Sequence, residues 1–458
     1  MVRKFVGVIG VGLAAALTLS GCGGGAAPEA GTGVYLEPET GNYPELPEGD
    51  GTSVDDGTIR PLPAVPEELP NRWVPLPDQF ADAHQLVDAI TVGWNLGNTL
   101  DSDIGTSPAS IRHNNPQRQE THWNNVVTTE DLILMVRDAG FNAVRIPVTW
   151  FSMMDEDGNI REDWFERVHE VVDYAYQNGM IVILNSHHDE PLWNLFDDGR
   201  SDALAAIENQ WRQIATRFEP YGQRLIFEGL NEPRTIGSEA EWSGGTPEER
   251  NNLNLMQQTF VDTVRATCPE NTDNLTGEAG WAICEGTNNW NRFLIATPYA
   301  ASATVPATEG LVIPTDPAGP DKIIVSIHMY APHEFALAND GIAEWSVDGE
   351  GPAGPDAIVD GLTRAHDLFV ANGYPVIFGE MGAQNRDNNE ARMAWADFYI
   401  RTARELGIRT FWWDNGSIGV RTGTGSGNEA FALFNRRLLT PTQPALINAI
   451  MQAVEATP

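Results

Sequence analysis

Eight short apolar runs, rich in β-branched and aromatic residues, recur along most of the chain and alternate with longer segments of helical period. Alternation of this kind is typical of α/β folds with a parallel sheet, whose strands are apolar on both faces. We predict strands at 91–97, 141–148, 180–188, 224–232, 292–299, 322–330, 374–382 and 408–416. We predict helices at 129–139, 162–178, 202–218, 251–267, 356–372, 388–406 and 443–454.

Eight strand–helix units over roughly 380 residues fit a closed (β/α)8 barrel, which we place at residues 75–458. A doubly wound open sheet is the alternative fold. It would usually carry a glycine-rich phosphate turn after its first strand, and the sequence Gly-Trp-Asn-Leu-Gly-Asn at 93–98 lacks that spacing. The barrel is therefore the preferred α/β architecture.

The N-terminus has the pattern of an export signal. Arg3 and Lys4 precede an apolar run over 5–19 that is too short to span a bilayer comfortably. Leu-Ser-Gly-Cys at 19–22 resembles the bacterial lipoprotein signal, in which Cys22 is lipidated and becomes the new N-terminus. An ordinary secretory leader is the alternative. We expect an exported lipoprotein of the cell envelope, held to the membrane by its lipid anchor alone.

Residues 23–74 have the composition of a disordered tether. Positions 23–70 contain eight Pro, nine Gly, ten acidic residues and one basic residue, Arg60. Such a segment buries too little apolar surface to offset the entropy of ordering it, and its like charges favour an extended chain. We expect it to hold the barrel away from the membrane.

Charge excludes one class of partner. The chain has 28 basic and 64 acidic side chains, a net charge of −36, whereas nucleic-acid binding needs clustered Lys and Arg. A neutral polymer remains compatible with this charge. Fourteen Trp against nine Tyr also favour a carbohydrate partner, because exposed indoles stack on sugar rings.

Polar side chains gather at the carboxyl ends of the predicted strands, where the chemistry of a (β/α)8 barrel lies. They are Trp94, Asn95, Asn98, Arg145, Asn185, His187, His188, Asp189, Asn231, Glu232, His328, Tyr330, Glu380, Trp412, Trp413 and Asp414. Two carboxyl groups facing each other across a barrel mouth suit glycoside hydrolysis, in which one protonates the leaving oxygen and the other attacks the anomeric carbon or activates water. Glu232 and Glu380 each follow an apolar run that should fix the backbone, so we assign them these roles.

These residues stand in motifs that resemble glycoside hydrolase family 5, most closely its bacterial endoglucanase and xyloglucanase branch. The motifs are GWNLGNTLD, FNAVRIPVTW, LNSHH, IFEGLNEPR, SIHMY, VIFGEMG and FWWDNG, and they span most of the barrel. The resemblance implies a retaining, cofactor- and metal-independent enzyme that cuts within a β-1,4-linked polysaccharide. It implies Glu232 as acid/base and Glu380 as nucleophile, with Arg145, His187, Asn231, His328, Tyr330 and Trp413 around them. We expect the two carboxyl groups to lie about 5 Å apart, as retention requires.

Several residues are candidates for substrate contact. Alternate residues of a strand point inward, and parity favours Trp413 over Trp412 as the floor of the sugar site. Trp94, Asn98, His188 and Trp123 are further candidates. Cys268 and Cys284 are expected to form a disulfide in an exported protein, and we expect the segment between them to shape the groove.

Two other functions remain possible from the residues alone. A metal-dependent hydrolase could use His187, His188, Asp189 and His328, but adjacent histidines on one strand should point to opposite faces, which leaves only one at the mouth. A surface lipoprotein that binds glycans without catalysis would explain the tether and the tryptophans but has no need of two strand-end carboxylates. We expect a monomer.

Overall fold

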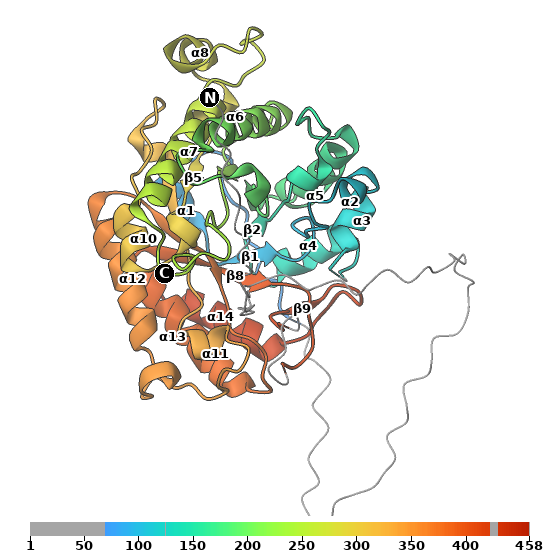
Figure 1. Cartoon of the computed structure of the whole chain (residues 1–458). Coiled ribbons are helices and arrows are strands. Elements are labelled where there is room, and N and C mark those ends of the chain that lie inside the picture. Colours follow the sequence, from blue (N-terminus) through green and yellow to red (C-terminus); the bar gives the residue numbers. More distant parts are fainter. Residues whose placement is uncertain (1–68, 124, 422–428, 458) are drawn as a thin grey trace, which may run out of the picture.

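The structure is a computed structural model that describes residues 69–123, 125–421 and 429–457, so the predicted signal, Cys22 and most of the predicted tether lie outside the described residues. Eight parallel strands form a closed barrel in the order β1 to β8, ringed by helices (Figure 1). The predicted (β/α)8 barrel is confirmed. The strands are β1 (Gly93–Leu96), β2 (Ala143–Ile146), β3 (Ile181–Asn185), β4 (Leu225–Glu228), β5 (Leu294–Ala296), β6 (Ile323–His328), β7 (Val376–Met381) and β8 (Ile408–Asp414).

All seven predicted helices are present, with ends that differ by a few residues. They are α4 (Glu130–Asp138), α5 (Glu162–Tyr176), α6 (Arg200–Arg217), α7 (Pro247–Arg265), α12 (Asp356–Leu368), α13 (Asn389–Glu405) and α14 (Pro444–Ala456). The shorter helices are α1 (Ala83–Ala89), α2 (Pro108–Arg112), α3 (Pro116–Thr121), α8 (Gly277–Cys284), α9 (Asn288–Asn291), α10 (Val305–Gly310) and α11 (His333–Ala336). Among the described residues, no helix has both the length and the apolar character needed to traverse a bilayer.

Two apolar clusters hold these layers together. The larger lies between the outward faces of the strands and the helices around them. The smaller fills the amino-terminal half of the barrel interior and is closed from below by α1, through Phe80, Leu86 and Val87. This lower plug keeps water out, so polar groups inside the barrel must find their partners at its carboxyl end.

A β-bulge in β7 decides which way Glu380 points. Ile377 belongs to the interior cluster and Phe378 to the outer one, so strict alternation would turn Gly379 inward and Glu380 outward. The register shifts between Phe378 and Met381, which lets Gly379 and Glu380 both face the interior. A Cβ on Gly379 would lie 2.5 Å from Ser326 Oγ, so only glycine fits beside the re-aimed carboxylate.

Two predicted boundaries are wrong. The fourth strand ends at Glu228, which places Glu232 in the following loop rather than on the strand. The tether ends before residue 74, because Arg72 donates its backbone N–H to the Asp138 carbonyl (2.8 Å) and its guanidinium to Asn448 Oδ1 (2.8 Å). The barrel domain thus begins a few residues earlier than composition indicated.

Cys268 and Cys284 are joined by a disulfide, but the segment between them does not shape the mouth. Helix α7 runs back from the mouth, so its last residue, Arg265, hydrogen-bonds the Arg292 carbonyl just before β5 begins. The Trp281 indole donates to the Asp262 carbonyl on the same helix end. The disulfide segment therefore lies at the amino-terminal end of the barrel, opposite the expected position. Its helix α8 stands out from the rest of the molecule (Figure 1).

Replacing Cys268 and Cys284 by serine should lower the free energy of unfolding by up to about 3 kcal/mol, because the bond closes a loop of 16 residues. Urea denaturation of the variant and of the wild type measures this. Chemistry at the barrel mouth should be unchanged, since the bond lies at the other end of the fold. Loss of activity without loss of stability would contradict the placement.

Candidate functional site

A single buried guanidinium organises the carboxyl end of the barrel. Arg145 on β2 is fully buried, and each of its three side-chain nitrogens donates to a partner. Its Nε donates to Glu228 Oε2 (2.7 Å), and its Nη2 donates to Asn231 Oδ1 (2.6 Å) and forms an ion pair with Glu228 Oε2 (2.7 Å). Its Nη1 donates to Asn95 Oδ1 (3.0 Å) and Glu380 Oε1 (2.8 Å). Residues of β1, β4, β7 and the loop after β4 are thereby fixed around one cation.

The two carboxyl groups singled out by sequence meet at this site. One oxygen of Glu232 and one of Glu380 lie within 4.8 Å of each other, with a ring nitrogen of His328 within the same distance of both. These oxygens are thus no farther apart than the roughly 5 Å typical of the carboxyl groups of retaining glycoside hydrolases. The predicted proximity of the pair is confirmed.

Each carboxyl group has its own set of partners. His328 Nδ1 lies 2.9 Å from Glu232 Oε1, and Arg234 Nη1 lies 3.5 Å from Glu232 Oε2. Glu380 accepts from Arg145 at Oε1 and from the Tyr330 hydroxyl at Oε2 (2.8 Å). The structure thus brings together Arg145, Asn231, His328 and Tyr330 with the two glutamates, as expected.

The two sets of partners separate the protonation states of the glutamates. Burial raises the pKa of Glu380, and the charge of Glu232 adds to this, while His328, Arg145 and Tyr330 oppose it. Burial also acts to raise the pKa of Glu232, but the hydrogen bond from His328 and the positive charges of His328 and Arg234 lower it to about 2.

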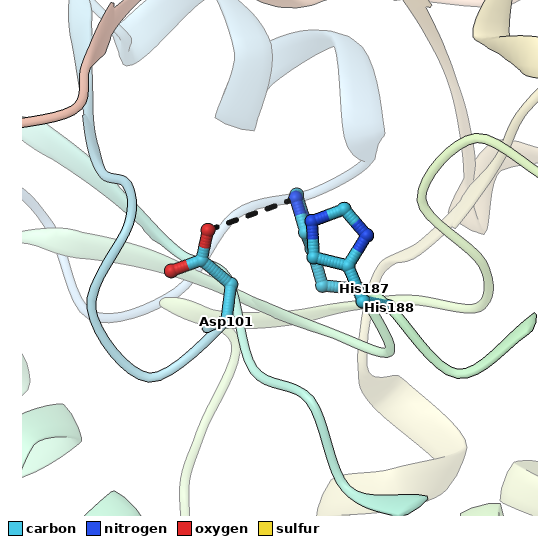
Figure 2. A group of neighbouring side chains, drawn as sticks. All are labelled: Asp101, His187 and His188. Atoms are coloured by element: carbon cyan, nitrogen blue, oxygen red, sulfur yellow. Dashed lines mark ion pairs between the residues drawn. The ribbon is translucent and has the colours of Figure 1, made fainter. Parts of the chain in front are cut away.

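His187 lies beside Asp101 and His188 (Figure 2), and a chain of hydrogen bonds holds its ring in one tautomer. Asn185 Oδ1 accepts the Val148 N–H, so its Nδ2 is the donor to Glu228 Oε2 (3.0 Å) and to His187 Nδ1 (3.0 Å). Burial, followed by nearby cations, lowers the pKa of His187 well below its usual value, so its ring is neutral. The remaining proton therefore sits on Nε2, 3.9 Å from Asp101 Oδ2, which makes this nitrogen a donor rather than a metal ligand.

The two adjacent histidines do not point to opposite faces. Their rings are in edge contact, with centroids 4.6 Å apart, because both lie beyond the end of β3, where strand alternation no longer holds. His188 also contacts the ring of Trp123 (5.6 Å) and lies 3.4 Å from Glu190 Oε1. Asp189 is turned away and caps the backbone N–H groups of residues 150 and 151. The four residues of the metal-hydrolase hypothesis therefore do not form one cluster.

The tryptophans of β1 and β8 face either the barrel interior or the surrounding helices, according to the alternation of side chains along each strand. Trp413 faces the interior and stacks on His187 with an interplanar angle of 4°, whereas Trp412 is fully buried outside the barrel and donates to the Phe431 carbonyl. Trp94 is 0% exposed, and its indole donates to Asp414 Oδ2 (3.1 Å), so its predicted substrate contact is wrong. The inward residue of β1 is Asn95, which follows from the same alternation.

Asn98 lies in the loop after β1 with a left-handed backbone (φ 55°), half-buried, its N–H donating to Asp101 Oδ2 (2.9 Å). Among the residues that the structure describes, no hydrogen bond ties the Asn98 side chain to the site, and its predicted substrate contact stays a prediction. Trp123 is likewise half-buried beside His188.

Sequence reasoning missed three residues of the site. Glu228, inside the motif that carries Glu232, is the buried counter-charge of Arg145. Arg234 contacts Glu232, pairs with Glu241 (3.2 Å) and lies 4.6 Å from the ring centroid of Trp242, which is 45% exposed. Strand alternation counted back from Asn231 could not identify these residues, because β4 ends at residue 228. The available signal was the sequence Pro233-Arg234 directly after Glu232.

Comparisons with known proteins agree with this geometry. The profile of the family described as cellulase (glycosyl hydrolase family 5) matches residues 106–419. Endoglucanase A of Ruminococcus albus is 39% identical over 378 residues, which cover 81% of this chain and 92% of that protein.

Solved structures give the same result. A GH5-4 broad specificity endoglucanase from Ruminococcus champanellensis with bound cellotriose aligns with a TM-score of 0.72 at 37% identity, covering 81% of this chain and 99% of the other. A family 5 lichenase from a Caldicellulosiruptor species, in complex with cellotetraose, aligns with a TM-score of 0.72 at 33% identity, covering 85% and 98%. The names of these relatives are those of enzymes, and none supports a binder without catalysis.

Replacing Tyr330 by phenylalanine should raise the pKa of Glu380 further, because the Tyr330 hydroxyl stabilises the ionised carboxylate. A group with a higher pKa stays protonated to a higher pH, so ionisation of Glu380 should occur later on raising the pH. Infrared difference spectra of the carboxyl band against pH measure this, with Glu380→Gln identifying the band. An unchanged titration would show that the hydroxyl does not stabilise the charge.

Proposed function

This chain belongs to glycosyl hydrolase family 5, and on that premise we propose that Glu380 and Glu232 hydrolyse β-1,4-linked glucans by double displacement. The enzyme is an endoglucanase-type glycoside hydrolase that retains anomeric configuration. The observation that carries the assignment of the two residues is their separation, within 4.8 Å, combined with their different partners.

In the first step, a Glu380 oxygen attacks the anomeric carbon and the bond from that carbon to the glycosidic oxygen breaks. Glu232 gives its proton to the departing oxygen, so the leaving chain ends in a hydroxyl and the glycosyl unit stays on Glu380 as an ester. In the second step Glu232, now ionised, takes a proton from water while the water oxygen attacks the same carbon. The ester bond breaks, Glu380 becomes a carboxylate again and Glu232 recovers its proton.

The surrounding groups support these roles. Arg145 and the Tyr330 hydroxyl each hold one oxygen of Glu380, so they orient the carboxylate and oppose its protonation. Asn231 accepts from Arg145 through Oδ1, which leaves its Nδ2 to donate to a sugar 2-hydroxyl, an interaction that strengthens in the oxocarbenium-like transition state.

Two aromatic surfaces flank the reacting pair. We assign Trp413, stacked on His187, as the floor under the sugar whose anomeric carbon reacts, with the His187 Nε2 proton as donor to a hydroxyl. Trp242 has one face covered by Arg234, which also contacts Glu232, so its other face suits a sugar of the departing chain. Relatives named as a broad specificity endoglucanase and a lichenase favour both β-1,4 and mixed-linkage glucans as substrates.

Replacing Glu380 by glutamine should abolish release of reducing ends from soluble β-glucans, because a neutral amide cannot form the ester. Replacing Glu232 by glutamine should slow hydrolysis of polysaccharide by about 10²- to 10⁴-fold, the usual contribution of a general acid. The loss should be far smaller for a dinitrophenyl cellobioside, whose leaving group needs no proton.

A panel of carboxymethylcellulose, mixed-linkage glucan, xyloglucan and mannan, assayed for reducing ends, tests the substrate class at the same time. Asp316→Asn is a matched control, since it changes a buried carboxylate paired with Arg265 away from the mouth. Equal losses for Glu232→Gln on activated and unactivated substrates would reject its role as the acid.

The sequence of residues 19–22 further supports a lipid anchor on Cys22 in the bacterial cell envelope. Cys22→Ser should abolish incorporation of labelled fatty acid and move the enzyme from the membrane pellet to the soluble fraction, with unchanged specific activity. Fatty-acid labelling and fractionation of cells that express both forms measure this. Membrane retention of the serine variant would contradict the anchor.

A further inference from the structure

One carboxylate beneath the mouth takes no part in the proposed chemistry. Glu228 ends β4 and is 0% exposed, so no sugar can reach it. Its Oε2 accepts from Arg145 Nε (2.7 Å) and from Asn185 Nδ2 (3.0 Å), and Arg145 Nη2 lies 2.7 Å from the same oxygen in an ion pair. Its Oε1 has no hydrogen-bond partner within the part of the chain that the structure describes. Any function of Glu228 must therefore act through its neighbours.

Arg145 stands between two carboxylates. Glu228 accepts from its Nε and forms an ion pair with its Nη2 from below, and Glu380 accepts from its Nη1 on the mouth side. One positive charge therefore faces two negative charges in a buried site, where charges interact strongly. Glu228 neutralises much of the cation that would otherwise act on Glu380 alone.

This arrangement matters because a nucleophile must be ionised and yet reactive. A carboxylate held by an uncompensated guanidinium is a more stable anion, and its lone pair is less available to attack carbon. We propose that Glu228 is a positioning residue that acts on Glu380 through Arg145: by neutralising part of the guanidinium charge from below, it limits how strongly Arg145 stabilises the Glu380 anion and so keeps the nucleophile reactive. The proposal rests on the proposed function only in naming Glu380 as the nucleophile.

Glu228 also holds a second part of the site. Its Oε2 fixes the Asn185 amide, which in turn fixes the proton of His187 on Nε2. A glutamine at 228 can keep its oxygen in the Oε2 position, so both hydrogen-bonding functions survive while the charge is lost. The substitution Glu228→Gln therefore separates the charge of Glu228 from its hydrogen bonds.

The direction of the effect follows from the groups that face Glu380. They are Arg145 from β2, His328 and Tyr330 from β6 and its loop, Glu232 from the loop after β4, and Glu429 from the segment after β8. Glu228→Gln alters none of these, but it leaves the charge of Arg145 uncompensated. Ionised Glu380 is then favoured, so it loses its proton at lower pH.

In Glu228→Gln we expect the acidic limb of the pH profile of kcat/KM for an aryl cellobioside to move down by about one to two pH units. This is the size of pKa shift expected when a charge is removed a few ångströms beyond Arg145. The rate at the optimum should fall, since the nucleophile is weaker. Asp316→Asn, which removes a buried counter-charge from Arg265, should lower stability without moving the limb. An unmoved limb, or one that moves to higher pH, overturns the proposal.

Two further measurements keep the outcome decisive. Infrared titration of the Glu380 carboxyl band in Glu228→Gln follows the same shift without turnover, so it decides the proposal even if the wild type fails to cut β-glucan. Glu228→Asp keeps the charge and should leave the acidic limb within a few tenths of a pH unit of the wild type even where kcat falls. A downward shift in Glu228→Asp would assign the effect to geometry and reject the proposal.

Discussion

The carboxyl end of this barrel depends on one ion, the guanidinium of Arg145, buried where water cannot reach it. Removing such a charge from water costs several kcal/mol unless every donor is satisfied. Its three side-chain nitrogens donate to Asn95, Glu228, Asn231 and Glu380, which come from four separate parts of the fold. Because none of the four can move without leaving a buried donor unpaired, the cation fixes their relative positions more tightly than strand pairing alone.

The apolar half of the barrel makes this dependence possible. The plug formed by α1 and the lower interior residues excludes water from below, so the electrostatic interactions above it are not screened from that side. The bulge at Gly379 then turns an extra side chain into the polar layer, at the cost of regular pairing between β7 and its two neighbours. An interrupted strand ladder and a buried cation are each unfavourable alone, and the Glu380 carboxylate joins them by accepting a hydrogen bond from Arg145.

Much of this could be read from the sequence, and the rest fails for identifiable reasons. Eight strands, seven helices and the meeting of Glu232 with Glu380 follow from periodicity and from motifs at strand ends. Trp94 was misassigned because a residue at a strand end was counted without its parity. Glu380 was assigned correctly although alternation alone would turn it outward, since a bulge has no reliable sequence signal. The disulfide segment was placed at the mouth because only its position after the fourth strand was considered; the predicted helix at 251–267, which is α7, returns the chain to the amino-terminal end of the barrel before Cys268.

The two catalytic carboxyl groups differ in the rigidity of their supports, and the chemistry accounts for the difference. Glu380 must form a bond to one carbon atom and later release it along the same direction. It lies on a strand, both of its carboxylate oxygens accept hydrogen bonds, and its side chain is 7% exposed. Glu232 must serve two different oxygens, first that of the departing sugar and then that of water. It lies four residues past the end of β4, and its side chain is 17% exposed. The two half-reactions at one carbon therefore require a fixed nucleophile and a more accessible acid/base. The fold places the acid/base on a loop because β4 ends early, and it places the nucleophile on a strand because β7 continues through its bulge.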